Sequence, residues 1–199
     1  AYARDVIAAD FAEAGDEDVF RKVAADLAGK ADAATIRAKM AELLPVAKAQ
    51  LYVWKNFLVP EVCDAVVDLI DRQLRDSTTT DAFADPKVRT SRTSDIGMLG
   101  HDLIMQLDEL MAEAIGIHWS YSDITQGQRY DVDQEYKAHY DYFVPGSHEY
   151  NVFCQFLGQR TWTFMIYLNE VDAGGGTRFK CIDKTFQPET GKLICWNNR

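Results

Sequence analysis

Cysteine and long apolar runs are scarce in this sequence of 199 residues. Its four cysteines, Cys63, Cys154, Cys181 and Cys195, form no Cys-x-x-Cys pair. Their scatter argues against a zinc knuckle and against a dithiol redox motif. Buried, unpaired thiols are typical of a reducing compartment, so we expect a cytoplasmic protein.

Positive charge is also in short supply, with 21 Lys and Arg against 31 Asp and Glu. The resulting net charge of -10 argues against nucleic acid or an anionic membrane as a partner. No apolar run approaches the ~20 residues that a membrane span needs. The N-terminus is acidic and rich in alanine, unlike a signal peptide.

The first quarter of the chain has the periodicity of helices. Val19, Phe20, Val23 and Leu27 fall at helical spacing, and a similar stripe begins at Ile36. No residues in this part have catalytic spacing. We therefore expect residues 1–49 to form a helical N-terminal extension that packs on the main domain or joins two copies in a homodimer.

Residues 50–199 combine helices with a later run of strands. Pro60 opens an amphipathic helix, and a second one runs over residues 102–115 and ends at Gly116. Expected strands cover residues 51–55, 124–130, 136–143, 150–157, 161–169, 176–180 and 192–196. This order predicts an α+β domain with a jelly-roll core of two sheets and helices packed on one of them.

His139 and Asp141 are the strongest candidates for chemistry. In an extended segment, residues two apart project from the same face. One imidazole and one carboxylate on one face supply two thirds of a 2-His-1-carboxylate iron site. A His-x-Asp tripeptide alone is a weak signal, because a surface strand with polar outward residues would look the same.

The segment 161–169 alternates in character. Trp162, Phe164 and Ile166 share an apolar face that we expect in the core, together with Leu168. Thr163, Met165 and Tyr167 share the other face. That second face carries a hydroxyl and a phenol, which could line a polar pocket.

Several weak motifs occur in a specific order. They are Asn56-Phe-Leu, Arg89-Thr-Ser91, Tyr130 nine residues before His139, His139-x-Asp141, Gln159 to Asn169, Gly174-Gly-Gly-Thr-Arg-Phe179, and Pro188-x-x-Gly191 leading to Trp196. Together they resemble the prolyl 4-hydroxylase-type branch of the iron(II)- and 2-oxoglutarate-dependent dioxygenases. The resemblance covers residues 50–199 and implies a double-stranded β-helix core.

The resemblance also implies roles for particular residues. His139 and Asp141 would be iron ligands and would carry the catalysis. Tyr130, Thr163 and Tyr167 would line the 2-oxoglutarate pocket. A peptide substrate would be held by Arg89, Ser91, Asp123, Tyr136 and Arg160. The implied cofactors are Fe(II), 2-oxoglutarate and O2, with ascorbate as a further candidate.

The family pattern needs a second histidine ligand, followed by a Lys or Arg for the far carboxylate of 2-oxoglutarate. His101, His118 and His148 do not occupy that position. The printed sequence stops just after an apolar run, Leu193 to Trp196, so we expect a C-terminal part of the core beyond residue 199. The alternative is that the protein is a degenerate, inactive relative of the family. As printed, the chain is expected to hold iron weakly or not at all, and to be inactive for that reason.

The resemblance implies hydroxylation of a peptidyl proline, as in a procollagen-proline 4-dioxygenase, with succinate and CO2 as coproducts. Two alternatives stay open. The protein could be a 2-oxoglutarate oxygenase that acts on another residue or on a small molecule. It could also be a non-catalytic β-roll that binds a partner through its acidic N-terminal helices.

Overall fold

A computed structural model of the chain describes residues 45–46, 49–79 and 85–198. The helical extension predicted for residues 1–49 therefore lies almost wholly outside the described residues. Its few described residues belong to two strands, β1 (Pro45–Val46) and β2 (Ala49–Trp54), so the prediction of helix was wrong for them.

Two helices form where the apolar spacing predicts them. Helix α4 (Pro60–Asp71) begins with the proline, whose missing N–H is no loss in the first helical turn. Helix α5 (Asp102–Ile115) ends at Gly116, which adopts a left-handed conformation with φ of 74°. Both helices bury one apolar stripe, which includes Val62 and Val66 in α4 and Leu103 and Leu107 in α5.

A four-stranded antiparallel sheet lies at the centre of the molecule, with strands in the order β1-β2-β9-β6. Strand β9 (Lys192–Asn197) pairs with β2 on one side and with β6 (Trp162–Tyr167) on the other. Residues from opposite ends of the domain are thus hydrogen-bonded neighbours. Leu51, for example, lies opposite Trp196.

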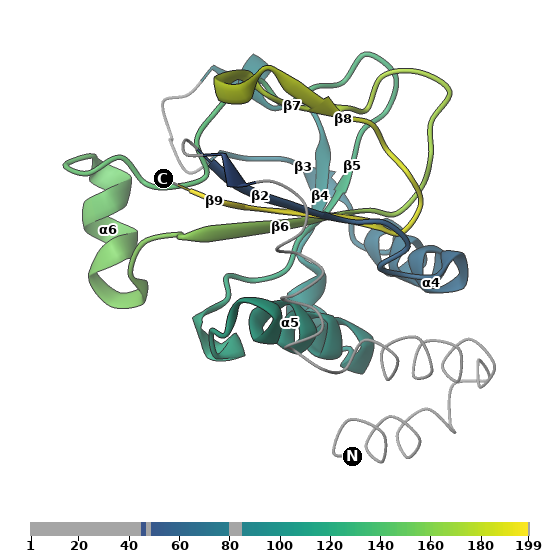
Figure 1. Ribbon diagram of the computed structural model, residues 1–199, viewed down its shortest axis with the longest axis horizontal. Coiled ribbons are helices and arrows are strands. Elements are labelled where there is room, and N and C mark those ends of the chain that lie inside the picture. Colours follow the sequence, from purple (N-terminus) through teal and green to yellow (C-terminus); the bar gives the residue numbers. More distant parts are fainter. Residues whose placement is uncertain (1–44, 47–48, 80–84, 199) are drawn as a thin grey trace.

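The two faces of this sheet pack against different layers (Figure 1). Helices α4 and α5 cover one face, where Trp162, Phe164 and Ile166 of β6 join the main hydrophobic core. On the other face, β7 (Thr177–Phe179) and β8 (Lys184–Phe186) form a hairpin over Met165 and Tyr167. The alternation predicted for residues 162–167 is confirmed.

The remaining elements are short. A three-stranded antiparallel sheet joins β3 (Arg75–Asp76), β4 (Arg92–Ser94) and β5 (Gly127–Arg129). In the described part of the chain, four 3-10 helices link the larger elements: η1 (Pro86–Val88), η2 (Ile96–Leu99), η3 (Trp119–Tyr121) and η4 (Lys180–Ile182). The described chain is a mixed fold of helices and antiparallel sheets, as the α+β prediction requires.

Two predicted strands are wrong. Residues 150–157 belong to helix α6 (His148–Leu157), because Ser147 caps the helix by accepting a hydrogen bond from Tyr150 N at 3.1 Å. Residues 136–143 form bends and irregular coil, apart from an isolated bridge between Tyr136 and Arg89. Four short strands of the structure, β1, β3, β4 and β8, were not predicted.

Gly191 fixes the start of β9 against the segment before α4. Its carbonyl accepts hydrogen bonds from Phe57 N at 2.8 Å and Leu58 N at 3.1 Å, and its N–H donates to Tyr167 O at 2.8 Å. The residue has a φ of 73°, and a Cβ atom there would lie 2.0 Å from Leu58 O. Only glycine fits this position without rearrangement.

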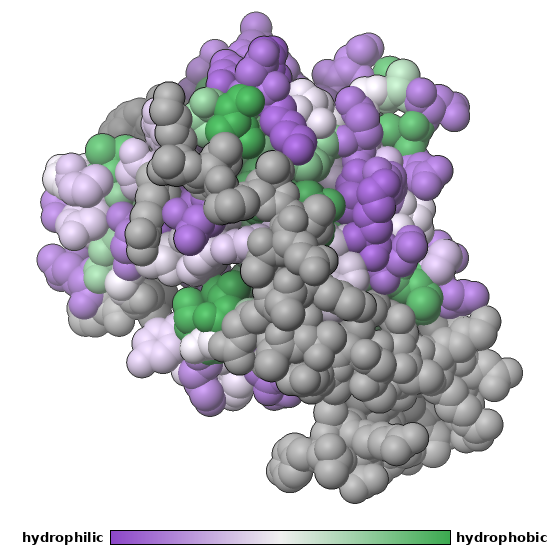
Figure 2. Space-filling view, in the orientation of Figure 1, coloured by the Kyte–Doolittle hydropathy of each residue, from purple (hydrophilic) through white to green (hydrophobic). Residues whose placement is uncertain are grey.

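Hydrophilic side chains cover most of the coloured surface in Figure 2, with apolar side chains in small separate patches. Within the described part of the chain, no helix has both the length and the apolar character of a membrane span.

Candidate functional site

His139 and Asp141 face each other in the structure. Nε2 of His139 lies 3.1 Å from Oδ1 of Asp141, and Nδ1 donates to the backbone oxygen of Lys137 at 2.7 Å. Their segment consists of bends, so they do not meet as members of a regular strand. The expected pairing of these two side chains is present although its predicted strand is not.

The environment of this pair favours the charged forms. Burial lowers the pKa of His139, but the hydrogen bonds to Asp141 and to Lys137 O outweigh it, and the pKa lies above its ordinary value. Burial raises the pKa of Asp141, but hydrogen bonds from His139 and Thr163 outweigh it and hold the pKa below its ordinary value. When His139 is protonated, its two ring nitrogens can donate to Asp141 and to Lys137 O.

Thr163 connects the pair to the central sheet. Its hydroxyl donates to Oδ2 of Asp141 at 2.7 Å and accepts from Nδ2 of Asn198 at 3.0 Å. Thr163 belongs to β6, and Asn198 directly follows β9. Two neighbouring strands thus fix the orientation of the Asp141 carboxylate.

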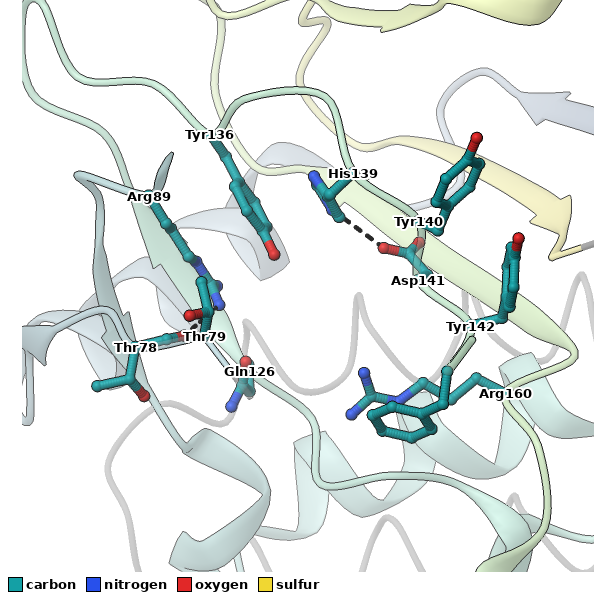
Figure 3. Close-up of a pocket in the computed structure, with 11 residues that line it drawn as sticks. Thr78, Thr79, Arg89, Gln126, Tyr136, His139, Tyr140, Asp141, Tyr142 and Arg160 are labelled. Carbon is teal, nitrogen blue, oxygen red and sulfur yellow. Dashed lines mark hydrogen bonds and ion pairs between the residues drawn. The ribbon is translucent and has the colours of Figure 1, made fainter. Parts of the chain in front are cut away.

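A pocket of about 210 Å³ opens beside the pair (Figure 3). It is lined by Thr78, Thr79, Arg89, Gln126, Tyr136, His139, Tyr140, Asp141, Tyr142, Phe143 and Arg160. In Figure 3, Arg89 and Arg160 reach it from opposite sides, with Gln126 between them. These residues come from the segment between β3 and β4, the loop before β5, the His139 segment and the residues just before β6.

Three of the lining side chains form a stacked column. The rings of Tyr136 and His139 are nearly parallel, with centroids 3.6 Å apart. On Tyr136 lies the guanidinium of Arg89, with Cζ 4.8 Å from the ring centroid. Burial raises the pKa of Tyr136, so its phenol stays protonated at neutral pH. The column can hold the imidazole plane in a fixed orientation.

Arg160 is anchored on the opposite wall. Its Nε donates to Oδ2 of Asp123 at 2.6 Å, and its guanidinium lies over the ring of Phe143 with Cζ 4.5 Å from the centroid. The Gln159 amide joins these parts, since its Oε1 accepts from Phe143 N at 2.8 Å and Arg160 N at 3.0 Å. Its Nε2 donates to Phe143 O at 2.7 Å.

Ser91 is not brought to the pocket wall. It is 2% exposed and shares hydrogen bonds with Ser77 at 2.8 Å and with Gln128 at 3.4 Å. Thr93 also donates to Gln128, at 2.9 Å. Ser91 therefore helps to hold the three-stranded sheet together and lies outside the pocket lining.

Tyr130 and Tyr167 also lie outside the pocket lining. Tyr130 is 45% exposed. The Tyr167 hydroxyl lies within hydrogen-bonding distance of two acceptors, Thr177 Oγ1 at 2.8 Å and Phe186 O at 3.0 Å. Burial raises the pKa of Tyr167. Thr163 contacts Asp141, a residue of the pocket lining, whereas Tyr130 and Tyr167 are not part of that lining. The three predicted cosubstrate residues therefore do not surround one described cavity.

Two side chains fit an iron site and a third is needed. His139 and Asp141 supply one nitrogen and one carboxylate at hydrogen-bonding distance, which matches the donor types of a 2-His-1-carboxylate site. No group of three or more His, Cys, Asp or Glu side chains suited to a metal occurs among the described residues. His101 and His118 instead cap α5 and η3 by accepting from backbone N–H groups.

Some pocket residues were missed from the sequence. Tyr140, Tyr142 and Phe143 lie within four residues of His139, so their proximity could have been predicted from the chain itself. Gln126 and the pair Thr78 and Thr79 are distant in sequence, and they gave no signal. Asn198 and Gln159 act through long-range hydrogen bonds that no local pattern encodes.

Comparison with known proteins bears on this site. The family model described as "2OG-Fe(II) oxygenase superfamily" matches residues 125–199, which include His139, Asp141 and Thr163. A separate family model, "ATPase inhibitor subunit zeta", matches residues 1–50.

Three relatives come from Arabidopsis thaliana. "Probable prolyl 4-hydroxylase 3" is 30% identical over 139 residues, covering 68% of this chain and 47% of the relative. "Prolyl 4-hydroxylase 5" is 33% identical over 132 residues, covering 64% and 43%. "Prolyl 4-hydroxylase 13" is 27% identical over 166 residues, covering 72% and 57%. The chain spans about half the length of these relatives.

Four findings agree with one another: the order of the motifs, the facing side chains of His139 and Asp141, the family match and the similarity to these relatives. The resemblance inferred from the sequence is therefore confirmed: residues 125–199 match the 2OG-Fe(II) oxygenase superfamily, and the chain is similar to prolyl 4-hydroxylases.

Proposed function

We propose that the protein is an Fe(II)- and 2-oxoglutarate-dependent dioxygenase that hydroxylates a proline residue within a peptide, releasing succinate and CO2. One observation carries the proposal. His139 and Asp141 converge at 3.1 Å on a pocket, inside the segment that matches the oxygenase family. The domain would occupy residues 50–199, with residues 1–49 as a separate extension and a double-stranded β-helix as its core.

His139 and Asp141 would hold the iron, together with a third protein ligand from outside the described residues. When bound, Fe(II) supplies the activation of O2 that oxidation of a C–H bond requires, with 2-oxoglutarate as the cosubstrate. The backbone oxygen of Lys137 keeps a proton on Nδ1 of His139, which leaves Nε2 for the metal. Thr163 would orient the carboxylate of Asp141 by its hydrogen bond.

The surroundings of the pair support a peptide as substrate. Arg89, Tyr136 and Arg160 line the pocket, and Asp123 anchors Arg160. Guanidinium groups can donate to peptide carbonyl oxygens, and aromatic rings suit the flat faces of proline. Tyr130, Thr163 and Tyr167 remain the proposed residues for 2-oxoglutarate, and ascorbate remains a candidate cofactor. Action on another residue or a small molecule is the alternative within the same reaction class.

The experiment is incubation of the full-length protein with Fe(II), 2-oxoglutarate and proline-rich peptides. We expect the peptide to gain the mass of one oxygen atom and succinate to form in equal amount. His139→Ala should abolish both, whereas His148→Ala, a histidine outside the pocket lining, should leave both unchanged. Succinate formation with a small molecule but never with a peptide would favour the alternative substrate class, and full activity of His139→Ala would refute the assignment.

A second function is supported for the N-terminal part, because residues 1–50 match the family named "ATPase inhibitor subunit zeta". We propose that these residues bind an ATPase, independently of the oxygenase domain. Binding through this segment also fits the prediction that acidic N-terminal residues form an interaction surface. A homodimer through residues 1–49 and a cytoplasmic location stay predictions; the latter rests on four cysteines that are all free thiols.

A further inference from the structure

The two arginines that line the pocket are paired differently. His139 pairs with Asp141 at 3.1 Å, and Arg160 pairs with Asp123 at 2.6 Å. Arg89, the other cation in the pocket lining, forms no ion pair with any carboxylate among the described residues. Within the described residues, the Arg89 guanidinium thus has no carboxylate partner.

Arg89 is also short of hydrogen bonds. Its Nη1 donates to the backbone oxygen of Thr78 at 3.1 Å, and its Nε is buried with no partner. The nearby carboxylate of Asp95 is already engaged by Arg75 at 2.7 Å and by Gln126 at 2.8 Å. A buried guanidinium nitrogen without a partner carries a desolvation cost that an added acceptor would remove.

The rest of the wall suits an anion. Thr78 and Thr79 lie next to the guanidinium of Arg89, and Arg160 points toward the same space from the far side (Figure 3). A guanidinium presents parallel N–H groups that match the two oxygens of a carboxylate. A neutral carbonyl could accept one of these hydrogen bonds, but it would leave the positive charge uncompensated.

We propose that this pocket is a carboxylate subsite, in which Arg89 recognises an acidic group of the ligand beside the reacting position. The inference rests on the proposed function in one respect, since the source of the carboxylate is taken to be a peptide. The acidic group would then belong to an Asp or Glu residue that flanks the target proline. A free dicarboxylic acid is the other source of the same chemistry.

The test is a binding titration of the intact chain with defined probes at one fixed ionic strength. Two capped proline-rich peptides differ only in having Glu or Gln next to the central proline, and glutarate serves as the free dicarboxylate. The wild type should bind the Glu peptide about tenfold more tightly than the Gln peptide. Arg89→Gln should abolish that preference, and Arg89→Lys should retain part of it.

Lys87→Gln is the matched control. It removes the same unit of charge two residues away, from an exposed side chain outside the pocket lining, so it should leave the preference unchanged. An equal loss in Lys87→Gln and Arg89→Gln would mean that only net charge matters, and it would overturn the subsite.

The outcomes also separate the subsite from the proposed function. If glutarate binds in an Arg89-dependent way but neither peptide binds, the carboxylate subsite holds and the peptide substrate fails. If both peptides bind equally well in wild type and in Arg89→Gln, and glutarate binding does not depend on Arg89, the subsite is refuted while the peptide function stands.

Discussion

At the scale of single residues, the charges of His139 and Asp141 determine how the site responds to pH. Folding raises the pKa of His139, so its contribution to stability is fully present below 6.5 and is lost as pH rises through the folded value. Folding lowers the pKa of Asp141, so its contribution is present above 3.8 and is lost as pH falls through the folded value. Together they stabilise the fold most between these two limits.

We predict that Asp141→Asn lowers the free energy of unfolding most within that window and progressively less outside it. Urea unfolding of metal-free protein at several pH values measures the difference. Asp183→Asn is the control, because its side chain is 82% exposed, and it should give a small difference at every pH. A constant difference between wild type and Asp141→Asn across the whole range would contradict the prediction.

The same residues show what a sequence can reveal about a site. His139 and Asp141 are two residues apart, so the chain holds them close whether or not a strand forms. Thr163 was placed on the correct face because alternation in β6 is a local property. The contact of Thr163 with Asn198 depends on the pairing of β6 with β9, which spacing within either strand does not specify.

At the scale of elements, helix α6 is inserted in the chain between the His139 segment and β6. The Gln159 side chain closes it with three hydrogen bonds to the backbone of Phe143 and Arg160. Because Phe143 follows Asp141 by two residues, this closure connects the His139 segment with the Arg160 side of the pocket. The side-chain amide of Gln159 thus joins these two segments in the way that backbone hydrogen bonds join paired strands.

We predict that Gln159→Met speeds hydrogen exchange at the amides of Phe143 and Arg160 and lowers the unfolding free energy by about 1 kcal/mol or more. Native-state exchange followed by NMR measures the first effect. Gln155→Met, at an exposed position on α6, is the control and should leave both amides protected. Unchanged protection in Gln159→Met would show that the closure depends on other contacts.

Elements were predictable where one residue type controls them. Pro60 marks the start of α4, and Gly116 marks the end of α5. An apolar stripe fixes the buried face of each helix. For residues 150–157, β-favouring Tyr, Val and Phe predicted a strand. The cap from Ser147 starts a helix there instead, because local hydrogen bonding outweighs a weak β-propensity.

At the scale of the whole molecule, the core can be located within the described residues. The buried members of the two hydrophobic clusters described there lie between Leu51 and Cys195. The family match to residues 1–50 lies before that core, and the match to residues 125–199 lies within its later half.

We therefore predict that a chain shortened to begin at residue 45 still unfolds cooperatively and keeps its near-ultraviolet circular dichroism. It should lose the effect on an ATPase that we propose for residues 1–50. The measurement compares both chains in thermal unfolding and in the rate of ATP hydrolysis by a purified ATPase that lacks its own inhibitor subunit. Loss of cooperative unfolding on shortening would show that the two parts fold as one unit.

The position of β9 between β2 and β6 also bears on how the protein is made. A ribosome synthesises residues 192–197 after both neighbouring strands, so β2 and β6 leave the exit tunnel with no strand between them. Closing this sheet brings together residues as distant as Leu51 and Trp196, which makes it a slow, late step in folding. Helices α4 and α5 can form earlier. The Thr163 hydroxyl, which donates to Asp141, can accept its hydrogen bond from Asn198 only after β9 has emerged.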